Sequence, residues 1–575
     1  MSDSRIELPI DFGRAVVAGI PGILEHQQPD GSIVYDPAAP VVYPQQAIFP
    51  LAYCWAGLAP DRAHEKDEKI RACIGRLGEY LVQRFSDKGE FTWGSYGNVV
   101  CGVDQRLTYA WTEGLRLLRE GGADFPYDAW GKKIAAACET LIEHRLRKLE
   151  GVRRFVGRVM GTSANHVSLY LTTLYRAGQV LGRPDLSEYA LAIARNFAAD
   201  VHPDGYWEEH GDLLRSGGPT PSYNYLTHCA MSLMYEWTGE SVFRAAMERS
   251  SAFHGNFCYP DAQFLELIDE RVRHGHGGRI WGLFGFSHTP SGRGVARAHF
   301  ASWRAHLADS RNAAPEALAR HCENALYWHN GDYAPAPFER TDHRATLTLP
   351  AGIFRRGDWC VGLNAMCATN AEDPAYRDNP FALEKQKLFS VWHARAGLIL
   401  DGSHAKGQPE NSTFATAAAY APDYWPCGGS VGEEDGAWVV YAAYKTFFGT
   451  AVLRPMNDQA LQVQLSVDPA ASRGPFAAGF TFIPAEWRIT SAAGKQVDWD
   501  LNEPFEGSGA DLGGRFRCGA FEIELPPEAK LIWPYRPFNS YAADRASGPK
   551  AALARVTVAL SPERPRANFV IRVPN

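Results

Sequence analysis

Three features that would define common classes of protein are missing from this chain of 575 residues. No apolar run approaches the ~20 residues that a membrane-spanning helix needs, which argues against a membrane protein. Lysine and arginine number 58 against 65 acidic residues, so the net charge is −7 and the basic surplus of a nucleic-acid-binding protein is absent. A polyanionic ligand stays compatible with this total, because a basic cleft can form locally on an acidic protein.

The cysteines lack a pattern. Their number, 11, is odd, their spacing is scattered and no CxxC pair occurs. This argues against a disulfide framework or a zinc ribbon and fits a reducing compartment. Residues 1–13 carry acidic side chains and no apolar signal segment, which predicts a cytoplasmic protein, or a periplasmic one if the chain has been trimmed.

What is present is ordinary globular material. Hydrophobic residues make up 45% and charged residues 21%, enough for two large domains or three smaller ones. Aromatic residues reach 12%, which suits large cores and also a carbohydrate cleft, where flat rings stack on sugar faces. Composition alone leaves both explanations open.

The first part of the chain, from residue 9 to about residue 330, predicts helices, because apolar residues recur at steps of three and four. Ser163 and Asp185 are the predicted N-caps of two of them. Paired antiparallel helices suit a solenoid or a closed toroid, and the lack of a strict repeat weakens the solenoid. The most periodic segments are 70–85, 107–118, 130–146, 166–181, 186–198, 225–236 and 242–254.

From about Thr341 the period changes to alternation between turns rich in Gly, Pro, Asn and Asp, which predicts a multi-strand β-sandwich. The fold class is therefore α+β and multidomain, with a helical domain at 1–335 and an antiparallel β-sandwich domain at 336–575. The predicted strands are 387–393, 397–401, 437–443, 460–467, 521–525, 554–560 and 569–573.

Two long irregular stretches interrupt the helices, at 201–221 and 259–297. Such segments are uncommon in compact domains and often carry function, although surface excursions explain them equally well. The second stretch contains the unusual run HGHGGR, which ends at Arg279. This run could contact substrate, bind a metal or form a plain glycine-rich loop. The metal is the least favoured of the three, because no further ligands accompany the run at a fixed spacing.

A few residue pairs stand at predicted element starts. Asn165 and His166 open a helix in GTSANHVSLYL, and helix N-termini favour anions. Tyr223 and Tyr225 open another helix in PSYNY, and His393 stands in the strand-like LFSVWHARAGLILDG. Taken alone, each is explained by capping or core packing.

Together these residues resemble the heparinase II/III-like and alginate-lyase-type polysaccharide lyases. That family joins an incomplete (α/α) toroid to an antiparallel β-sandwich, and the likeness in architecture covers nearly the whole chain. Its Asn-His pair matches Asn165-His166, its downstream tyrosine matches Tyr223, and its sandwich histidine matches His393. The family often has Tyr-Gly where this chain has Tyr-Asn, so Tyr225 stays a competitor for the tyrosine.

The resemblance implies that the protein cleaves a glycan containing uronic acid by β-elimination, leaving a 4,5-unsaturated uronide. The C5 proton is weakly acidic, so donors must neutralise the carboxylate while a base and an acid act. Asn165 and His166 would neutralise it, with His166 as an alternative base toward one C5 epimer. Tyr223 would be the acid and an alternative base toward the other epimer, with His393 as a further catalytic residue. The predicted substrate-binding residues are Tyr225, Arg106, Arg279, His288, Arg293 and Trp207.

The implied partner is an acidic poly- or oligosaccharide, with no nucleic acid and no membrane. The elimination requires no metal or organic cofactor, and no catalytic metal site is predicted. Some relatives hold a structural divalent metal in the sandwich, for which His404 and Asp401 are weak candidates. An exposed sandwich face would permit a homodimer.

Two other functions compete. A glycoside hydrolase on an (α/α) toroid, acting on uronides, would need two carboxylates beside the bond. Its candidate residues are Asp104, Glu113, Glu208, Glu209 and Asp212. The third alternative is a non-catalytic carbohydrate-binding protein.

Overall fold

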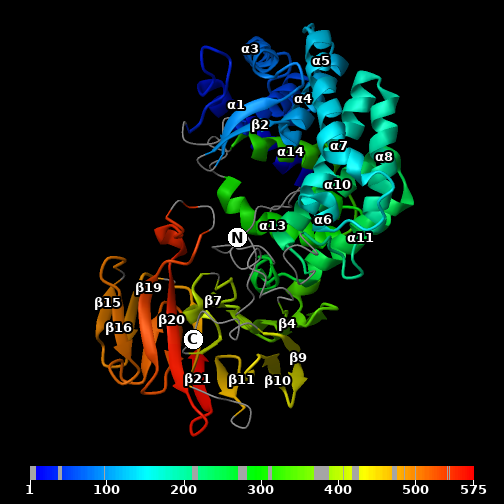
Figure 1. The fold of residues 1–575 in the computed structure, drawn as a ribbon. Coiled ribbons are helices and arrows are strands. Elements are labelled where there is room, and N and C mark those ends of the chain that lie inside the picture. Colours follow the sequence, from blue (N-terminus) through cyan, green and yellow to red (C-terminus); the bar gives the residue numbers. More distant parts are fainter. Residues whose placement is uncertain are drawn as a thin grey trace. The chain divides into compact units, whose positions relative to one another are not determined.

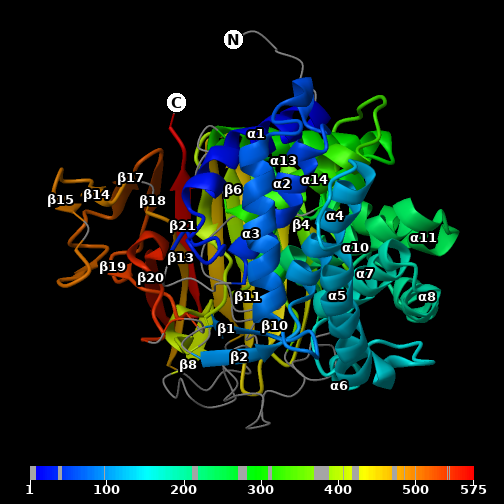
Figure 2. The same cartoon turned by 90° about the horizontal axis from the view of Figure 1, so that it is seen from above.

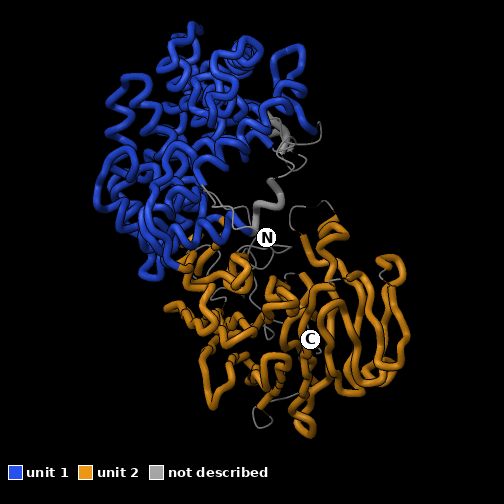
Figure 3. The backbone as a smooth tube through the Cα atoms, turned by 180° about the vertical axis from the view of Figure 1, so that it is seen from behind, with its two compact units in different colours: residues 1–207, 223–252, 279–334 blue, residues 208–222, 253–278, 335–575 orange. Residues whose placement is uncertain are grey.

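The computed structural model forms two compact units (Figure 3). The helical unit comprises Met1–Trp207, Tyr223–Ala252 and Arg279–Ala334, and the sandwich unit comprises Glu208–Ser222, Phe253–Gly278 and Pro335–Asn575. The sequence-based division at 335/336 differs in the two segments 208–222 and 253–278, which belong to the sandwich unit. The structure describes residues 8–36, 42–95, 98–209, 218–269, 282–307, 314–367, 387–405, 407–416, 426–468, 475–484, 486–498, 500–539, 542 and 544–574.

The described N-terminal part of the chain is built almost entirely from helices, as the three- and four-residue periodicity predicts (Figure 1). None of the helices in the described ranges is both long and apolar enough to cross a membrane. The helices are α1 (Leu8–Glu25), α2 (Ile48–Trp55), α3 (Glu68–Arg84), α4 (Gln105–Glu120), α5 (Tyr127–Leu141), α6 (Gly157–Met160), α7 (Ala164–Leu181), α8 (Pro184–Ala199), α10 (Pro221–Thr238), α11 (Ser241–Asn256), α12 (Leu283–Phe286), α13 (Pro290–Leu307) and α14 (Pro315–Tyr327).

Burial separates inner from outer helices in this unit. Every residue of α2 is buried, and α4 and α7 are buried over most of their length, whereas α3, α5 and α8 alternate buried and exposed positions. The contacts agree, because α2, α4 and α7 pack in succession while α8 packs on α7 and lies outside it in both views (Figures 1 and 2). The helices α2, α4 and α7 therefore form an inner layer.

Two hydrogen bonds fix the relative direction of α4 and α7. Near the start of α4, the Gln105 carbonyl accepts from the Thr173 hydroxyl at 2.9 Å, and near its end Arg119 donates to the Val180 carbonyl at 3.0 Å. Both residue numbers rise together along the pair, so the two helices run in the same direction. Their N-terminal ends consequently lie at the same end of the layer.

Strand-forming segments of the sandwich unit pair into two antiparallel sheets that share one apolar core. In the described residues, one sheet has the order β15-β14-β17-β18-β21-β12-β11-β10-β9 and the other β16-β19-β20-β13-β7-β6-β5-β4-β3, with β8 added on β13. The strands of this unit are β3 (Asp342–Thr346), β4 (Ala351–Arg356), β5 (Trp359–Asn364), β6 (Phe389–His393), β7 (Gly397–Asp401), β8 (Phe414–Thr416), β9 (Gly428–Glu434), β10 (Ala437–Ala443), β11 (Phe448–Asn457), β12 (Ala460–Val467), β13 (Phe476–Phe482), β14 (Arg488–Ser491), β15 (Gln496–Asp498), β16 (Phe505–Ser508), β17 (Arg515–Cys518), β18 (Phe521–Glu524), β19 (Lys530–Tyr535), β20 (Leu553–Leu560) and β21 (Arg566–Arg572).

The strand pattern follows from side-chain alternation. In β12 every second residue is buried, so Val463 and Leu465 enter the core while Gln462 and Gln464 stay partly exposed. The residues of β5 are all buried, as expected for a strand covered on both faces. The predicted fold class, helices followed by antiparallel sheets, is confirmed.

Local details correct the sequence analysis in three places. Asp185 does not cap α8, which begins at Pro184; instead its carboxylate pairs with Arg183 at 2.7 Å. Ser163 occupies the N-cap position of α7 without a side-chain capping bond. A two-stranded sheet formed by β1 (Phe91–Ser95) and β2 (Asn98–Gly102) was not predicted. All eleven cysteines lie in the described part of the chain, and each is a free thiol.

Candidate functional site

A pocket of about 790 Å³ opens at the N-terminal ends of α4 and α7. It lies wholly within the helical unit. Its walls come from α4, α7, the end of α5 with the π-helical turn Ile142–Leu146, and β2. The lining residues are Tyr43, Glu90, Cys101, Gly102, Val103, Asp104, Gln105, Arg106, Thr140, Leu141, His144, Arg145, Thr162, His166 and Tyr170.

His166 reaches this pocket because it stands in the first turn of α7. Its Nδ1 lies 3.0 Å from the Thr162 hydroxyl, which orients the imidazole ring. Backbone N–H groups that lack a helical acceptor gather at such a helix start and favour an anion there. The helix start and the histidine thus favour the same kind of ligand.

Two arginines and two histidines line the pocket, beside two carboxyl groups. Arg106 is the second residue of α4, and His144 and Arg145 lie on the π-helical turn that follows α5. Single π-helical turns are rare and are often found at functional sites, since the wider turn redirects side chains. Two guanidinium groups facing one cavity suit the binding of carboxylates.

The pocket also holds groups that can carry protons. Burial raises the pKa of Tyr170, although the Arg145 charge opposes this, so the phenol is protonated at neutral pH and can donate. Asp104 caps α4 by accepting from the Leu107 N–H at 2.8 Å, and burial nevertheless raises the pKa of its carboxyl. Glu90 adds a second carboxyl group to the lining.

Asn165 and the two candidate tyrosines are placed differently. Asn165 is 1% exposed and is not among the lining residues, and its Oδ1 accepts from the Ser163 hydroxyl at 2.5 Å. Tyr223, in the first turn of α10, is half-buried and is also outside this lining. Tyr225 is fully buried, with its hydroxyl 3.2 Å from His299 Nε2. A catalytic acid must reach the sugar, so the partly exposed Tyr223 is the better candidate than the fully buried Tyr225.

The first turn of α10 is held firmly. Asn224 accepts from the Trp207 backbone N–H at 3.2 Å and donates to the Ser250 hydroxyl at 3.1 Å. Trp207 itself is buried, stacks on Phe197 with ring centres 5.9 Å apart, and donates its indole N–H to the Phe197 carbonyl. Trp207 was predicted to contact the substrate, but its ring packs in the core and it is not among the residues that line the pocket.

His393 is held by the backbone on both sides of its ring. Its Nε2 lies 2.8 Å from the Asp458 carbonyl oxygen, and its Nδ1 accepts from the Arg395 N–H at 3.2 Å. The residue is fully buried beside Trp359, and burial lowers the pKa of the imidazole. These contacts argue against the predicted catalytic role, because both ring nitrogens already have backbone partners.

Two of the other predicted substrate-binding residues also have structural partners. Arg293 is buried and donates to the backbone carbonyls of Ser287 and Asp332, so its guanidinium is not presented to a ligand. His288 pairs with Glu236 rather than with the pocket, with Nε2 and Oε1 2.8 Å apart. Arg279 lies outside the described residues. Arg106 is the predicted binding residue that the described pocket contains.

Asp401 and His404, the predicted metal ligands of the sandwich, are not arranged as a metal site. Asp401 forms a buried ion pair with Lys387, whose ammonium supplies the positive charge that a divalent ion would bring. Ser403 donates to the same carboxylate at 2.6 Å. Among the described residues, His404 and Asp401 belong to no group of three metal-ligating side chains. This donor set does not fit a divalent ion.

Sequence reasoning did not pick out His144, Arg145 and Tyr170. The first two were read as the end of one long helix at 130–146, and a π-helical turn has no sequence signal of its own. Tyr170 carried a usable signal, because it stands four residues after His166 and so shares its helix face.

No protein-family model matches this sequence. No curated protein matches it either. Solved structures do resemble its backbone. The crystal structure of heparinase III gives a TM-score of 0.55 at 11% identity, covering 97% of this chain and 84% of that chain. Heparan sulfate lyase HepC from Pedobacter heparinus gives 0.46 at 11% identity, covering 99% and 84%. An unsaturated glucuronyl hydrolase specific for heparin gives 0.34 at 11% identity, covering 56% and 97%.

The match to heparinase III extends over nearly the full chain. It shows that the chain has the fold of that lyase, a helical region followed by antiparallel sheets, and it confirms the architectural resemblance noted in the sequence. At this level of identity the comparison establishes the fold, and the chemistry must be argued from the site.

Proposed function

We propose that the protein is a polysaccharide or oligosaccharide lyase that cleaves an acidic, uronic-acid-containing glycan by β-elimination. The observation that carries this proposal is the pocket at the helix starts, which combines Arg106, Arg145 and His166 with the phenol of Tyr170. These are the residue types that hold a carboxylate and move protons. The heparinase III fold supports the same class of reaction by analogy.

Arg106, Arg145 and His166 bind the uronate carboxylate in this account. Withdrawing the C5 proton builds negative charge on that group, and positioned donors lower the barrier by stabilising it. The dipole of α7, whose positive end lies at its first turn, adds to the effect. We assign Asn165 to the same group of donors through its amide nitrogen, because its amide oxygen already accepts from the Ser163 hydroxyl.

Tyr223 is proposed as the acid that protonates the leaving oxygen. Both α7 and α10 have 18 residues, and Trp237 near the end of α10 stacks on Tyr175 in the second half of α7, with ring centres 5.9 Å apart. In this proposal α10 runs in the direction of α4 and α7, which puts its first turn at the same end of the layer as His166. Tyr170, which lines the pocket, is the competing phenol.

The test is a panel of uronic-acid polysaccharides and oligomers assayed by ultraviolet absorbance, because elimination creates a double bond conjugated to the carboxylate. We expect one substrate class to give a rising signal. Arg106→Gln should raise KM about 10–100-fold by removing a charge-assisted contact. Arg71→Gln, which removes an exposed charge on α3, is the matched control. No signal with any substrate, or equal effects of the two variants, would contradict the proposal.

A hydrolase is the second candidate, favoured by one observation. Asp104 and Glu90 line the same pocket, and the raised pKa of Asp104 suits a general acid. Glu113 is unsuited because it is fully buried between Arg116 and Arg176, and Asp212 lies outside the described residues. A hydrolase of unsaturated uronides would lower the ultraviolet signal of its substrate, whereas a lyase raises it.

A further inference from the structure

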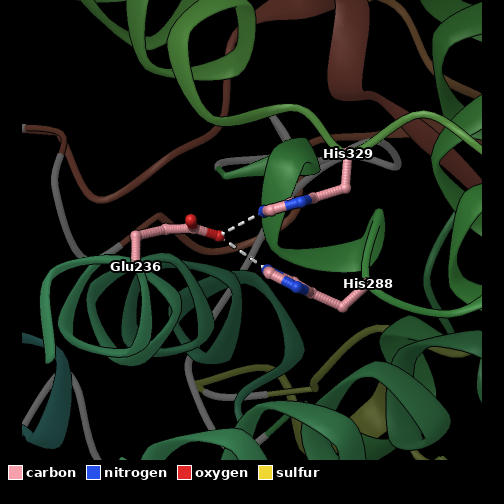
Figure 4. Close-up of side chains that lie close together, drawn as sticks. All are labelled: Glu236, His288 and His329. Atoms are coloured by element: carbon pink, nitrogen blue, oxygen red, sulfur yellow. Dashed lines mark hydrogen bonds and ion pairs between the residues drawn. The ribbon is translucent and has the colours of Figure 1, made fainter. Parts of the chain in front are cut away.

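Three side chains from separate segments of the helical unit converge on one point away from the residues that line the pocket (Figure 4). Glu236 is on the last turns of α10, His288 stands in the link between α12 and α13, and His329 follows α14. Glu236 Oε1 lies 2.8 Å from His288 Nε2 and 2.9 Å from His329 Nε2. Their possible ligand atoms all lie within 4.8 Å of one another.

We propose that Glu236, His288 and His329 form a binding site for one divalent transition-metal ion of the zinc class. Two imidazoles and one carboxylate are ligands that Zn²⁺ prefers, and three protein ligands with a water in the fourth position make an open tetrahedral site. Nothing in the proposed elimination uses this cluster, so the proposal stands apart from the lyase function.

The distances fit a site that the ion would open slightly. Zn–N bonds of about 2.0–2.1 Å place tetrahedral ligand atoms about 3.3 Å apart. The two histidine nitrogens therefore have to move away from the Glu236 oxygen by roughly half an ångström, which side-chain rotation provides. The rings of His288 and His329 already lie side by side, with centres 4.3 Å apart.

Burial and access are both suitable. The side chains of His288 and Glu236 are 10% and 13% exposed, whereas His329 is 47% exposed. An ion can therefore enter from the His329 side, where water completes its coordination. Burial opposes ionisation of Glu236, but its contacts with both histidines outweigh this and hold its pKa below the usual value, so the carboxylate is charged at neutral pH.

The segments that carry the ligands are braced. Arg293 donates to the carbonyls of Ser287 and Asp332, residues next to His288 and close to His329. The His329 backbone N–H donates to the Ser287 hydroxyl at 2.9 Å. Arg293 is thus a positioning residue for the cluster, and metal sites commonly depend on such supporting contacts.

The test is titration of the chelator-stripped full chain with zinc chloride, followed by calorimetry. We expect one equivalent to bind in the wild type and to be lost, or weakened at least about tenfold, in Glu236→Gln and in His288→Asn. His64→Asn is the matched control, because His64 lies 3.5 Å from Asp67 in a partly exposed histidine–carboxylate pair elsewhere. Exposed thiols such as Cys101 and Cys427 can bind zinc too, so the informative quantity is the equivalent lost in each variant.

Two further measurements separate lost binding from lost folding. Zinc should raise the melting temperature of the wild type and of His64→Asn, and should leave that of Glu236→Gln unchanged. Cobalt chloride should give visible absorption bands of a tetrahedral site in the wild type and not in His288→Asn. If the variants keep the wild-type melting temperature in chelator and still bind the same number of zinc ions with the same affinity, the site does not exist. Absence of a zinc equivalent in the wild type overturns it equally.

Discussion

In the helical unit, polar and charged side chains at helix starts line a cavity, whereas in the sandwich unit Lys387, Asp401 and His393 pair with another side chain or with the backbone. Arg106, Arg145 and His166 face the pocket. Lys387 and Asp401 form a closed ion pair, and His393 is held by two backbone groups. The first backbone N–H groups of a helix have no acceptor within the helix, whereas the N–H groups inside a sheet are paired with the next strand. We therefore expect an anion to bind in the helical unit.

The largest expected effect is on the proposed acid. Tyr223→Phe should lower kcat/KM by about 10²–10⁴-fold, because a positioned proton donor contributes that much to a rate. Steady-state kinetics on the substrate found by the panel, with circular dichroism to check folding, measures this. If Tyr223→Phe retains full turnover and Tyr170→Phe loses it, the acid is Tyr170 in the described pocket.

In the sandwich unit we expect a loss of stability, not of activity, when a buried ion pair is broken. Lys387→Met leaves Asp401 charged and buried without its cation, which should cost about 3–5 kcal/mol of unfolding free energy. Urea unfolding measures this change. The double variant Lys387→Met with Asp401→Leu should recover part of the loss, and additive losses in the double variant would contradict the ion-pair explanation.

A smaller effect on activity is expected from replacing Asn165 in the helical unit. Asn165→Ala should lower kcat by about 10²–10³-fold, the range found when one donor to a developing negative charge is removed. Ser163→Ala is the control, because it removes the bond that orients the amide and keeps the amide itself. Equal kcat in Asn165→Ala and the wild type would restrict Asn165 to packing.

The smallest effect is expected at His393. His393→Leu leaves the Asp458 carbonyl and the Arg395 N–H without their ring partners, which should cost about 1–3 kcal/mol. The kcat of the folded variant should stay at the wild-type value. A drop in kcat comparable to that of Tyr223→Phe, at unchanged stability, would return His393 to the catalytic residues.

Much of the fold could be predicted from the sequence, because long periodic segments report which side of an element is buried. The predicted strands at 397–401, 437–443 and 460–467 coincide with β7, β10 and β12. The π-helical turn at Ile142–Leu146 could not be predicted, since its residues continue the helical pattern of α5. The β1–β2 hairpin lies among helices and was hidden by them.

The site was predictable only where position along a helix decides function. His166 was found because it stands at a helix start, and Arg106 was chosen as an arginine able to bind a uronate; both line the pocket. His393, Arg293 and Trp207 all bond to backbone groups, and the pattern of side chains along a sequence does not show such partners. A sequence shows that a side chain can bind, but it does not show that the fold has already used that side chain.

The central claim is that this site breaks a glycosidic C–O bond without adding water. The reaction should be run to completion and the products weighed by mass spectrometry. Elimination predicts products whose masses add up to the mass of the substrate, one of which carries the unsaturated uronide. Products whose masses add up to the substrate plus one water for each bond cleaved would show hydrolysis and contradict the account.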